Sequence, residues 1–194
     1  MARVPQARHF LGWLGTSLAL ALAGCVIVDQ GDDDDDDVGG GQTPGPAPTS
    51  SAPAASPEGP AGEVFSLVNQ ARARARSCGD KSFPAAAPLR WSEPLARAAR
   101  AHSEDMAARD YFSHVTPENK DLADRVAAQG YAFSALGENI AAGQRSAADA
   151  VEGWLASPGH CENIMSGAFQ DIGIGRAEGG SFGVYWTQKF AAPR

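Results

Sequence analysis

The sequence of 194 residues lacks an excess of basic charge: it holds 16 Lys and Arg against 23 Asp and Glu, for a net charge of −7. A protein whose main partner is nucleic acid needs a basic surface for the phosphates, so nucleic acid is excluded as the main partner. Residues 61–194 are nearly neutral, with 14 Lys and Arg against 15 Asp and Glu, whereas residues 25–60 hold eight acidic residues and no basic one. The net charge therefore describes a short segment rather than a globular domain.

The chain also lacks an apolar run long enough to cross a bilayer, which takes about 20 residues. The apolar stretch at residues 10–22 is shorter, follows Arg3 and Arg8, and ends in Leu-Ala-Gly-Cys at residues 22–25. A basic start before a short apolar stretch is typical of an export signal. The tetrapeptide resembles the lipobox of bacterial lipoproteins, which implies cleavage of residues 1–24 as a signal peptide and lipidation of Cys25. An uncleaved signal anchor with a buried cysteine is the alternative.

Residues 25–60 have almost nothing to bury in a core. They hold a run of aspartates at 32–37 and three glycines at 39–41, and Pro, Ser, Ala and Thr dominate the rest. This composition predicts a disordered tether, which would average about 33 Å end to end if flexible. Capture of Ca²⁺ by the aspartates is disfavoured, because the spaced ligands and glycine turn of a calcium loop are missing. The segment is therefore interpreted as a spacer between a membrane anchor and a body.

Cysteine is scarce, with three residues in the whole chain. If Cys25 carries a lipid, Cys78 and Cys161 remain as an even pair in an exported protein, where oxidising surroundings favour a disulfide. The bond would close a loop of about 80 residues. The alternative is a reactive thiol at Cys161, next to His160 in the sequence. We expect the disulfide.

Residues 61–194 have the length of one domain. Apolar residues recur at helical spacing in the first part and alternate near the C-terminus, which predicts helices followed by strands. The expected helices cover residues 62–76, 93–110, 121–129 and 146–156, and the expected strands cover residues 171–176 and 181–190. Gly179 and Gly180 between the two strands fit a tight turn. This order of elements predicts an α+β fold with an antiparallel sheet.

Several short motifs occur in a fixed order along this domain. They are Asn-Gln-Ala-Arg at 69–72, Ala-His-Ser-Glu-Asp-Met at 101–106, Tyr-Phe-Ser-His at 111–114, Gly-Glu-Asn-Ile-Ala at 137–141, Gly-Trp-Leu-Ala-Ser-Pro-Gly-His at 153–160 and Tyr-Trp-Thr-Gln at 185–188. Together they resemble the CAP superfamily (cysteine-rich secretory proteins, antigen 5 and pathogenesis-related protein 1), in its bacterial SCP-like branch. The resemblance covers about residues 62–191 and implies an α-β-α sandwich, with a central antiparallel sheet flanked by helices.

The resemblance also implies a groove in which two histidines and two acidic residues face one another, often around a divalent cation. The motifs place His114, Glu138 and His160 at three of these positions, and Ser157 at the position of the second acid. Two imidazoles and one carboxylate can hold Zn²⁺ with water completing the shell, so His114 and His160 are the candidate metal ligands. The missing second acid argues against catalysis by paired carboxylates.

Considered without the family resemblance, these residues give weaker evidence for a functional role. His114 and His160 both fall in expected loops, where functional residues concentrate, although a surface or hydrogen-bonding role is the ordinary one. His102 lies on the inward stripe of its helix, which favours a buried or groove-edge histidine over a ligand. Ser157 precedes a proline, where a hydroxyl commonly bonds to the backbone.

Three functions stay open. The first is a ligand-binding module of the bacterial cell envelope, periplasmic or at the cell surface, held to the membrane by a lipid. The second is a hydrolase, with Ser157, His160 and Glu138 as nucleophile, base and orienting acid, or with a Zn²⁺-activated water. No nucleophile elbow or His-Glu-x-x-His motif supports the hydrolase. The third is a structural or interaction protein without an active site; the extracellular or periplasmic ligand is not named by the sequence.

Overall fold

The computed structural model describes residues 26–29 and 57–194. The predictions for the signal peptide, for lipidation of Cys25 and for the acidic tether at residues 30–56 lie outside these described residues. Within the described ranges, no helix combines the length and the apolar character that crossing a membrane requires.

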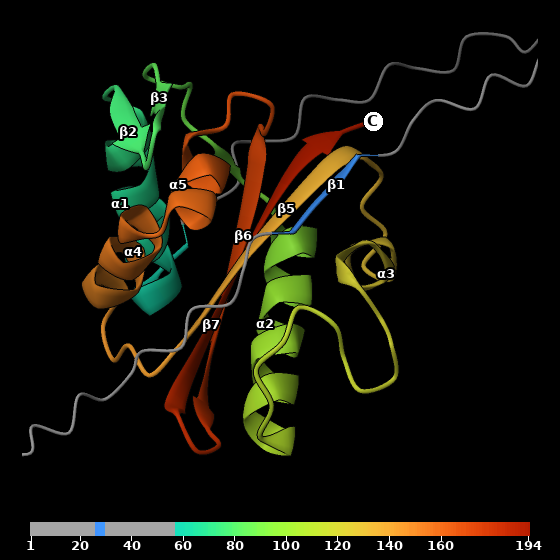
Figure 1. Cartoon of the computed structure of the whole chain (residues 1–194). Coiled ribbons are helices and arrows are strands. Elements are labelled where there is room, and N and C mark those ends of the chain that lie inside the picture. The colour runs from blue at the N-terminus through green and yellow to red at the C-terminus, as the bar shows by residue number, and fades with distance from the viewer. Residues whose placement is uncertain (1–25, 30–56) are drawn as a thin grey trace, which may run out of the picture.

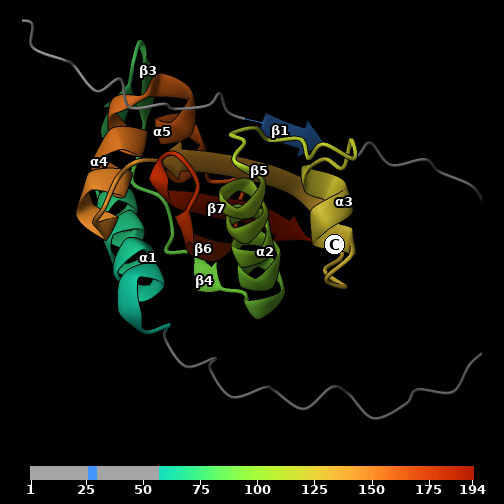
Figure 2. The ribbon, with the colours of Figure 1, turned by 90° about the horizontal axis from the view of Figure 1, so that it is seen from below.

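A sheet lies between two layers of helices (Figures 1 and 2). One layer holds α1 (Gly59–Arg72), α4 (Ala147–Ala156) and α5 (Pro158–Met165), and the other holds α2 (Glu93–Arg109) and α3 (Leu122–Ala127). The structure thus has the expected α-β-α sandwich.

The sheet has five strands in the order β1 (Val26–Asp29), β5 (Phe133–Ala142), β7 (Gly183–Pro193), β6 (Asp171–Gly179) and β4 (Arg90–Trp91). The pairs are antiparallel except that of β4 with β6, which is parallel. The expected turn at Gly179 and Gly180 joins β6 to β7, and both glycines have positive φ. A separate hairpin consists of β2 (Arg76–Cys78) and β3 (Lys81–Phe83).

The first helix ends earlier than predicted, at Arg72. The Arg72 side chain turns inward and donates to the carbonyls of Ala87, Ile164 and Ser166, at 2.7 to 2.8 Å. The arginines that follow therefore leave the helix, and Arg76 begins β2. The prediction of a helix to residue 76 was wrong because a buried arginine anchors the helix end.

Helix α5 and the strands β1 to β5 were not expected. Pro158 lies in the first turn of α5, where a proline is tolerated, so His160 lies in a helix rather than a loop. Residues 26–29, which fall within the predicted tether, form β1 on the edge of β5. The predicted disulfide is confirmed: Cys78 of β2 and Cys161 of α5 are bonded, with 5.4 Å between their Cα atoms.

Strand β5 is buried on both faces. The alternation of its side chains between these faces determines where the predicted site residue Glu138 points. Leu136 and Ile140 pack in the clusters under α2, whereas Ala141 packs with Trp154 of α4 in the cluster on the opposite face. Because successive side chains alternate, Glu138 points to the α2 side and Asn139 to the α5 side.

Helix α2 lies directly on two glycines of β6. A Cβ at Gly173 would lie 2.1 Å from the Ala96 nitrogen, and one at Gly175 would lie 2.2 Å from the Arg100 nitrogen. Only glycine fits this approach, which fixes the distance of α2 from the sheet.

Candidate functional site

The Glu138 carboxylate lies at the centre of a buried cluster of cations, and its exposed fraction is 0%. Oε1 lies 2.8 Å from Nδ1 of His114, and Nη2 of Arg125 donates to both carboxylate oxygens at 3.0 Å. The Lys189 ammonium, also fully buried, donates to Oε2. We call Glu138, His114, Arg125 and Lys189 the Glu138 cluster.

Four elements supply this cluster. The β5–β7 ladder sets Lys189 directly opposite Glu138. Arg125 comes from α3, whose start is fixed by a reciprocal capping box between Asp121 and Asp124. Nη1 of Arg125 also donates to the Lys120 carbonyl at 2.9 Å. The cluster therefore joins the sheet to α3 and to the loop before it, which carries His114.

His102 of α2 supports that loop from the other side. Its Nε2 lies 3.0 Å from the Ser113 carbonyl and 3.9 Å from Oε1 of Glu138. Burial lowers the pKa of His102 to about 3, although the Glu138 carboxylate opposes the shift. The ring is therefore neutral at pH 7, and its Nε2–H donates to the carbonyl beside His114.

The charges in the cluster determine the protonation states of Glu138 and Lys189. Burial alone would raise the pKa of Glu138, but attraction to Lys189, the hydrogen bond to His114 and the charge of Arg125 hold it well below its ordinary value. Burial lowers the pKa of Lys189 to about 8, while Glu138 opposes the shift. At neutral pH the cluster holds a carboxylate between cations.

This arrangement limits the chemistry of Glu138. A carboxylate whose two oxygens already contact three nitrogen-bearing side chains is a poor general base, because its pKa lies far from neutrality. Two adjacent cations also repel a divalent metal ion. Among residues 57–194, no group of three His, Cys, Asp or Glu side chains is placed to hold a metal. The cluster therefore does not fit Zn²⁺ at Glu138, and Zn²⁺ on His114 and His160 stays a prediction.

The structure brings His114 to Glu138, and it holds the other predicted residues on α5. The backbone carbonyl of His160 accepts from Nδ2 of Asn139 at 3.1 Å, so α5 is tied to β5 one residue after Glu138. Ser157 is the N-cap of α5, but its hydroxyl makes no capping hydrogen bond, contrary to the expected role. A groove shared by all four residues stays a prediction.

Sequence reasoning missed Lys189 and Arg125. Lys189 carried a usable signal, since it falls within the strand predicted for residues 181–190, and in the structure both faces of β7 are buried. A lysine at a buried strand position needs an acidic partner. Arg125 precedes Val126, a buried residue of a short helix, and its charge alone gives no such signal.

A cavity of about 730 Å³ lies beside the cluster, between α2, α3 and the loop that joins them. His102 and Arg125 line it, together with Asp105, Arg109 and Thr116. Nδ1 of His102 and Nε of Arg125 are both buried, and the described residues offer neither atom a hydrogen-bond partner. Both residues line the cavity, but these two atoms are closed off from it.

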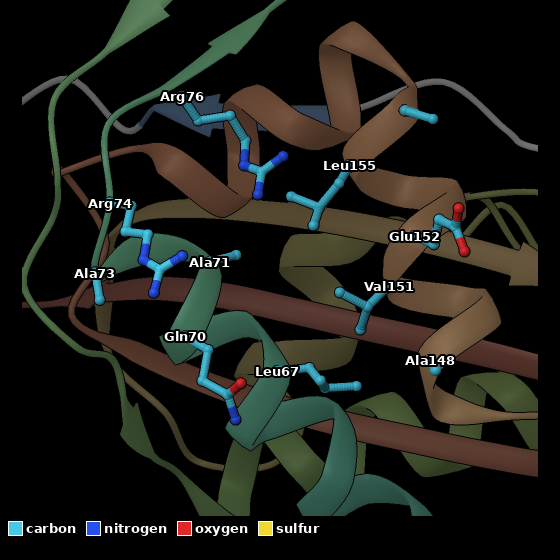
Figure 3. A pocket seen from close by; sticks show the side chains of 11 residues that line it. Leu67, Gln70, Ala71, Ala73, Arg74, Arg76, Ala148, Val151, Glu152 and Leu155 are labelled. Atoms are coloured by element: carbon cyan, nitrogen blue, oxygen red, sulfur yellow. The ribbon is translucent and has the colours of Figure 1, made fainter.

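A second hollow, of about 710 Å³, lies between α1 and α4 (Figure 3). Leu67, Val151 and Leu155 form its apolar surface, and Arg74 and Glu152 stand at its margin. None of the residues predicted for the groove lines it.

The match to a family model extends over residues 65–190, and the family is CAP, the cysteine-rich secretory protein family. The chain therefore belongs to the CAP family, and its body is a CAP domain of the type found in extracellular proteins.

Two relatives come from Bacillus subtilis strain 168. The uncharacterized protein YkwD is 40% identical over 103 residues, which are 53% of this chain and 39% of that protein. The uncharacterized membrane protein YlbC is 38% identical over 104 residues, 54% of this chain and 29% of that protein. The chain thus spans less than half the length of these relatives.

Solved structures agree on the fold. An extracellular protein containing a SCP domain from Bacillus anthracis is 35% identical, with a TM-score of 0.50 over 55% of this chain and 34% of that one. An outer surface protein from Borrelia burgdorferi is 16% identical, with a TM-score of 0.54 over 68% of this chain and 90% of that one, which shows the fold alone.

Removing one partner of the buried pair should destabilise the domain strongly. Glu138→Gln leaves Lys189 and Arg125 facing a neutral amide, and Lys189→Met removes one of the two cations. We expect each to cost about 3–5 kcal/mol of unfolding free energy, with Glu138→Gln the more costly. Urea denaturation followed by tryptophan fluorescence measures both. A cost below about 1 kcal/mol for Glu138→Gln, typical of exposed pairs, would contradict the role given to the cluster.

His102 should make the domain less stable in mild acid. The unfolded chain takes up a proton near the ordinary pKa of 6.5, whereas the folded protein excludes it down to about 3. The free energy of unfolding should therefore fall as pH falls below about 6.5, by about 1.4 kcal/mol per pH unit from this group.

His102→Gln provides the matched control, because glutamine can donate to the Ser113 carbonyl and does not titrate. We expect the pH dependence of stability between about pH 6 and pH 5 to flatten by that amount in the variant. Equal slopes for the two proteins would show that His102 is protonated in the folded state.

Proposed function

We propose that this protein is a lipid-anchored, ligand-binding CAP-domain protein of the bacterial cell envelope. The lipobox-like tetrapeptide that ends at Cys25 supports the anchor, and the disulfide between Cys78 and Cys161 suits an oxidising compartment. The CAP domain supplies the binding module.

The observation that carries binding rather than hydrolysis is the state of Glu138. Its carboxylate is fully buried and held between Lys189, Arg125 and His114. A hydrolase of the Ser157, His160 and Glu138 kind needs the acid to orient the base, yet both oxygens of this acid are engaged elsewhere. The cluster lies beside a cavity with its charges already paired, which suits recognition.

The cavity between α2 and α3 is the proposed ligand site. Its volume lies within the range of small-molecule sites. The exposed residues Glu118, Asn119 and Lys120 line it and offer both acceptors and donors. A hydroxyl group both donates and accepts, so the proposed ligand is a small hydroxylated molecule from the extracellular or periplasmic space.

A soluble sugar tests this assignment. We expect N-acetylglucosamine, which carries hydroxyl and amide groups, to give saturable chemical-shift changes at residues around the cavity. Ala101→Trp, an exposed position of α2 that lines this cavity, should fill it and abolish binding. Ala148→Trp fills the hollow between α1 and α4 and should leave binding unchanged. Binding that survives Ala101→Trp would place the ligand elsewhere, and labelling of Ser157 by a fluorophosphonate would favour the hydrolase.

The family resemblance adds the proposal of Zn²⁺ on His114 and His160. Nδ1 of His114 is engaged by Glu138, so a metal ion on this ring would bind at Nε2, with the carboxylate fixing the orientation of the ring. We therefore expect the wild-type chain to retain more Zn²⁺ than a His114→Ala, His160→Ala variant in equilibrium dialysis. Equal retention by the two chains would rule out the metal site.

A further inference from the structure

The strand β1 comes from far away in the sequence and lies along the outer edge of β5 (Figures 1 and 2). The pairing is antiparallel and regular over four residues, with Val26 opposite Glu138 and Asp29 opposite Ala135. Strand β5 pairs with β7 on its other side. Without β1, the segment of β5 that holds Glu138 would therefore be an open sheet edge.

The hydrogen-bonding direction along β5 is fixed by its neighbours. The Gly143 N–H donates to the Val184 carbonyl, so the odd residues of this strand bond to β7. The even residues then direct their backbone groups to the outer edge. Two contacts agree: Nε1 of Trp154 donates to the Ile140 carbonyl at 3.2 Å, and Nδ2 of Asn163 donates to the Glu138 carbonyl at 3.3 Å.

Side chains of α4 and α5 thus bind the outward carbonyls of Ile140 and Glu138, and β1 pairs with residues 135–138. The outward N–H and C=O of Leu136 find no partner among the described residues except in β1. Unpaired backbone N–H and C=O groups at a sheet edge can pair with another strand, so this edge of β5 is suited to bind one. The run Val-Ile-Val at residues 26–28 has the side chains that favour an extended strand.

We propose that the outer edge of β5 at residues 135–138 is a strand-docking site and that its occupant is the chain's own Val26–Asp29. Val26, the first residue of this strand, lies opposite Glu138 and follows Cys25 in the sequence. A membrane anchor on Cys25 would hold this edge of the domain at the membrane, and residues 30–56 would not set the distance. The inference goes beyond the proposed function, because docking does not depend on acylation or on a ligand.

The ladder supplies a matched pair of variants. Val28 lies opposite Leu136, an even residue, so its N–H points to β5, whereas the N–H of Ile27 points away. Val28→Pro removes a ladder hydrogen bond, and Ile27→Pro introduces the same ring without removing one. Both are made in the full chain carrying Cys25→Ser, which prevents acylation.

Hydrogen exchange measured by NMR reads the edge directly. We expect the Leu136 and Glu138 amides to exchange slowly in the parent chain and with Ile27→Pro, and about tenfold faster with Val28→Pro. The Gly137 and Asn139 amides bond to β7 and should stay protected in all three chains, which separates loss of docking from unfolding. Fast exchange of Leu136 in the parent chain, or equal exchange with both proline variants, would overturn the proposal.

A cross-link tests the occupant. Asp29 and Ala135 are a non-hydrogen-bonded pair, in which Cα atoms lie about 4.5 Å apart, close enough for a disulfide. We expect Asp29→Cys with Ala135→Cys, again with Cys25→Ser, to form a bond within one chain. The control with Val28→Cys and Ala135→Cys is out of register and should not form it. Cross-linked dimers would assign the strand to a second copy, and absence of any cross-link would place it elsewhere; both results contradict docking within one chain.

Discussion

A buried carboxylate must be balanced by nearby charge, and this requirement organises the α2 side of the domain. Glu138 sits in the sheet with Lys189 opposite it, while Arg125 and His114 arrive from α3 and the preceding loop. Because a lone buried charge costs several kcal/mol, none of these residues is independent of the others. The position of α3 follows both from the place of one acid on β5 and from Leu122 and Val126, which pack in the core.

The Gly-Glu-Asn motif of β5 serves both faces of the sheet. Gly137 has no side chain because the Phe169 ring lies 2.8 Å from where its Cβ would be. Glu138 forms ion pairs with Arg125 and Lys189 on the α2 side. Asn139, on the other side, accepts from Asn163 and donates to Gln188, each at 2.9 Å. Three consecutive residues therefore set a close approach, an ion cluster and a polar network, and the network attaches α5 to the sheet.

The parts of the fold that were predictable are those with a clean period. Helices α2 and α4 and the β6–β7 hairpin have a clear period in the sequence. Once Cys25 was set aside, Cys78 and Cys161 had one possible pairing. Strand β5 was not predictable from periodicity, because its sequence, Phe-Ser-Ala-Leu-Gly-Glu-Asn-Ile-Ala-Ala, mixes small, polar and apolar residues without a period of two. Of the site, the motifs indicated His114 and Glu138. Lys189 and Arg125 are defined only by the tertiary contact, and the place of His160 in a helix depends on a proline that starts α5.

The glycines beneath α2 determine which parts of the domain are free to adjust. Since no side chains separate α2 from β6 at Gly173 and Gly175, the helix cannot slide or tilt without backbone collision. The cavity next to Glu138 therefore has one fixed wall. Its opposite wall is the short helix α3 and the loop before it, which are joined to the sheet through the Glu138 cluster and through Leu122 and Val126. Any change in the size of the cavity must come from this second wall moving against a stationary first one.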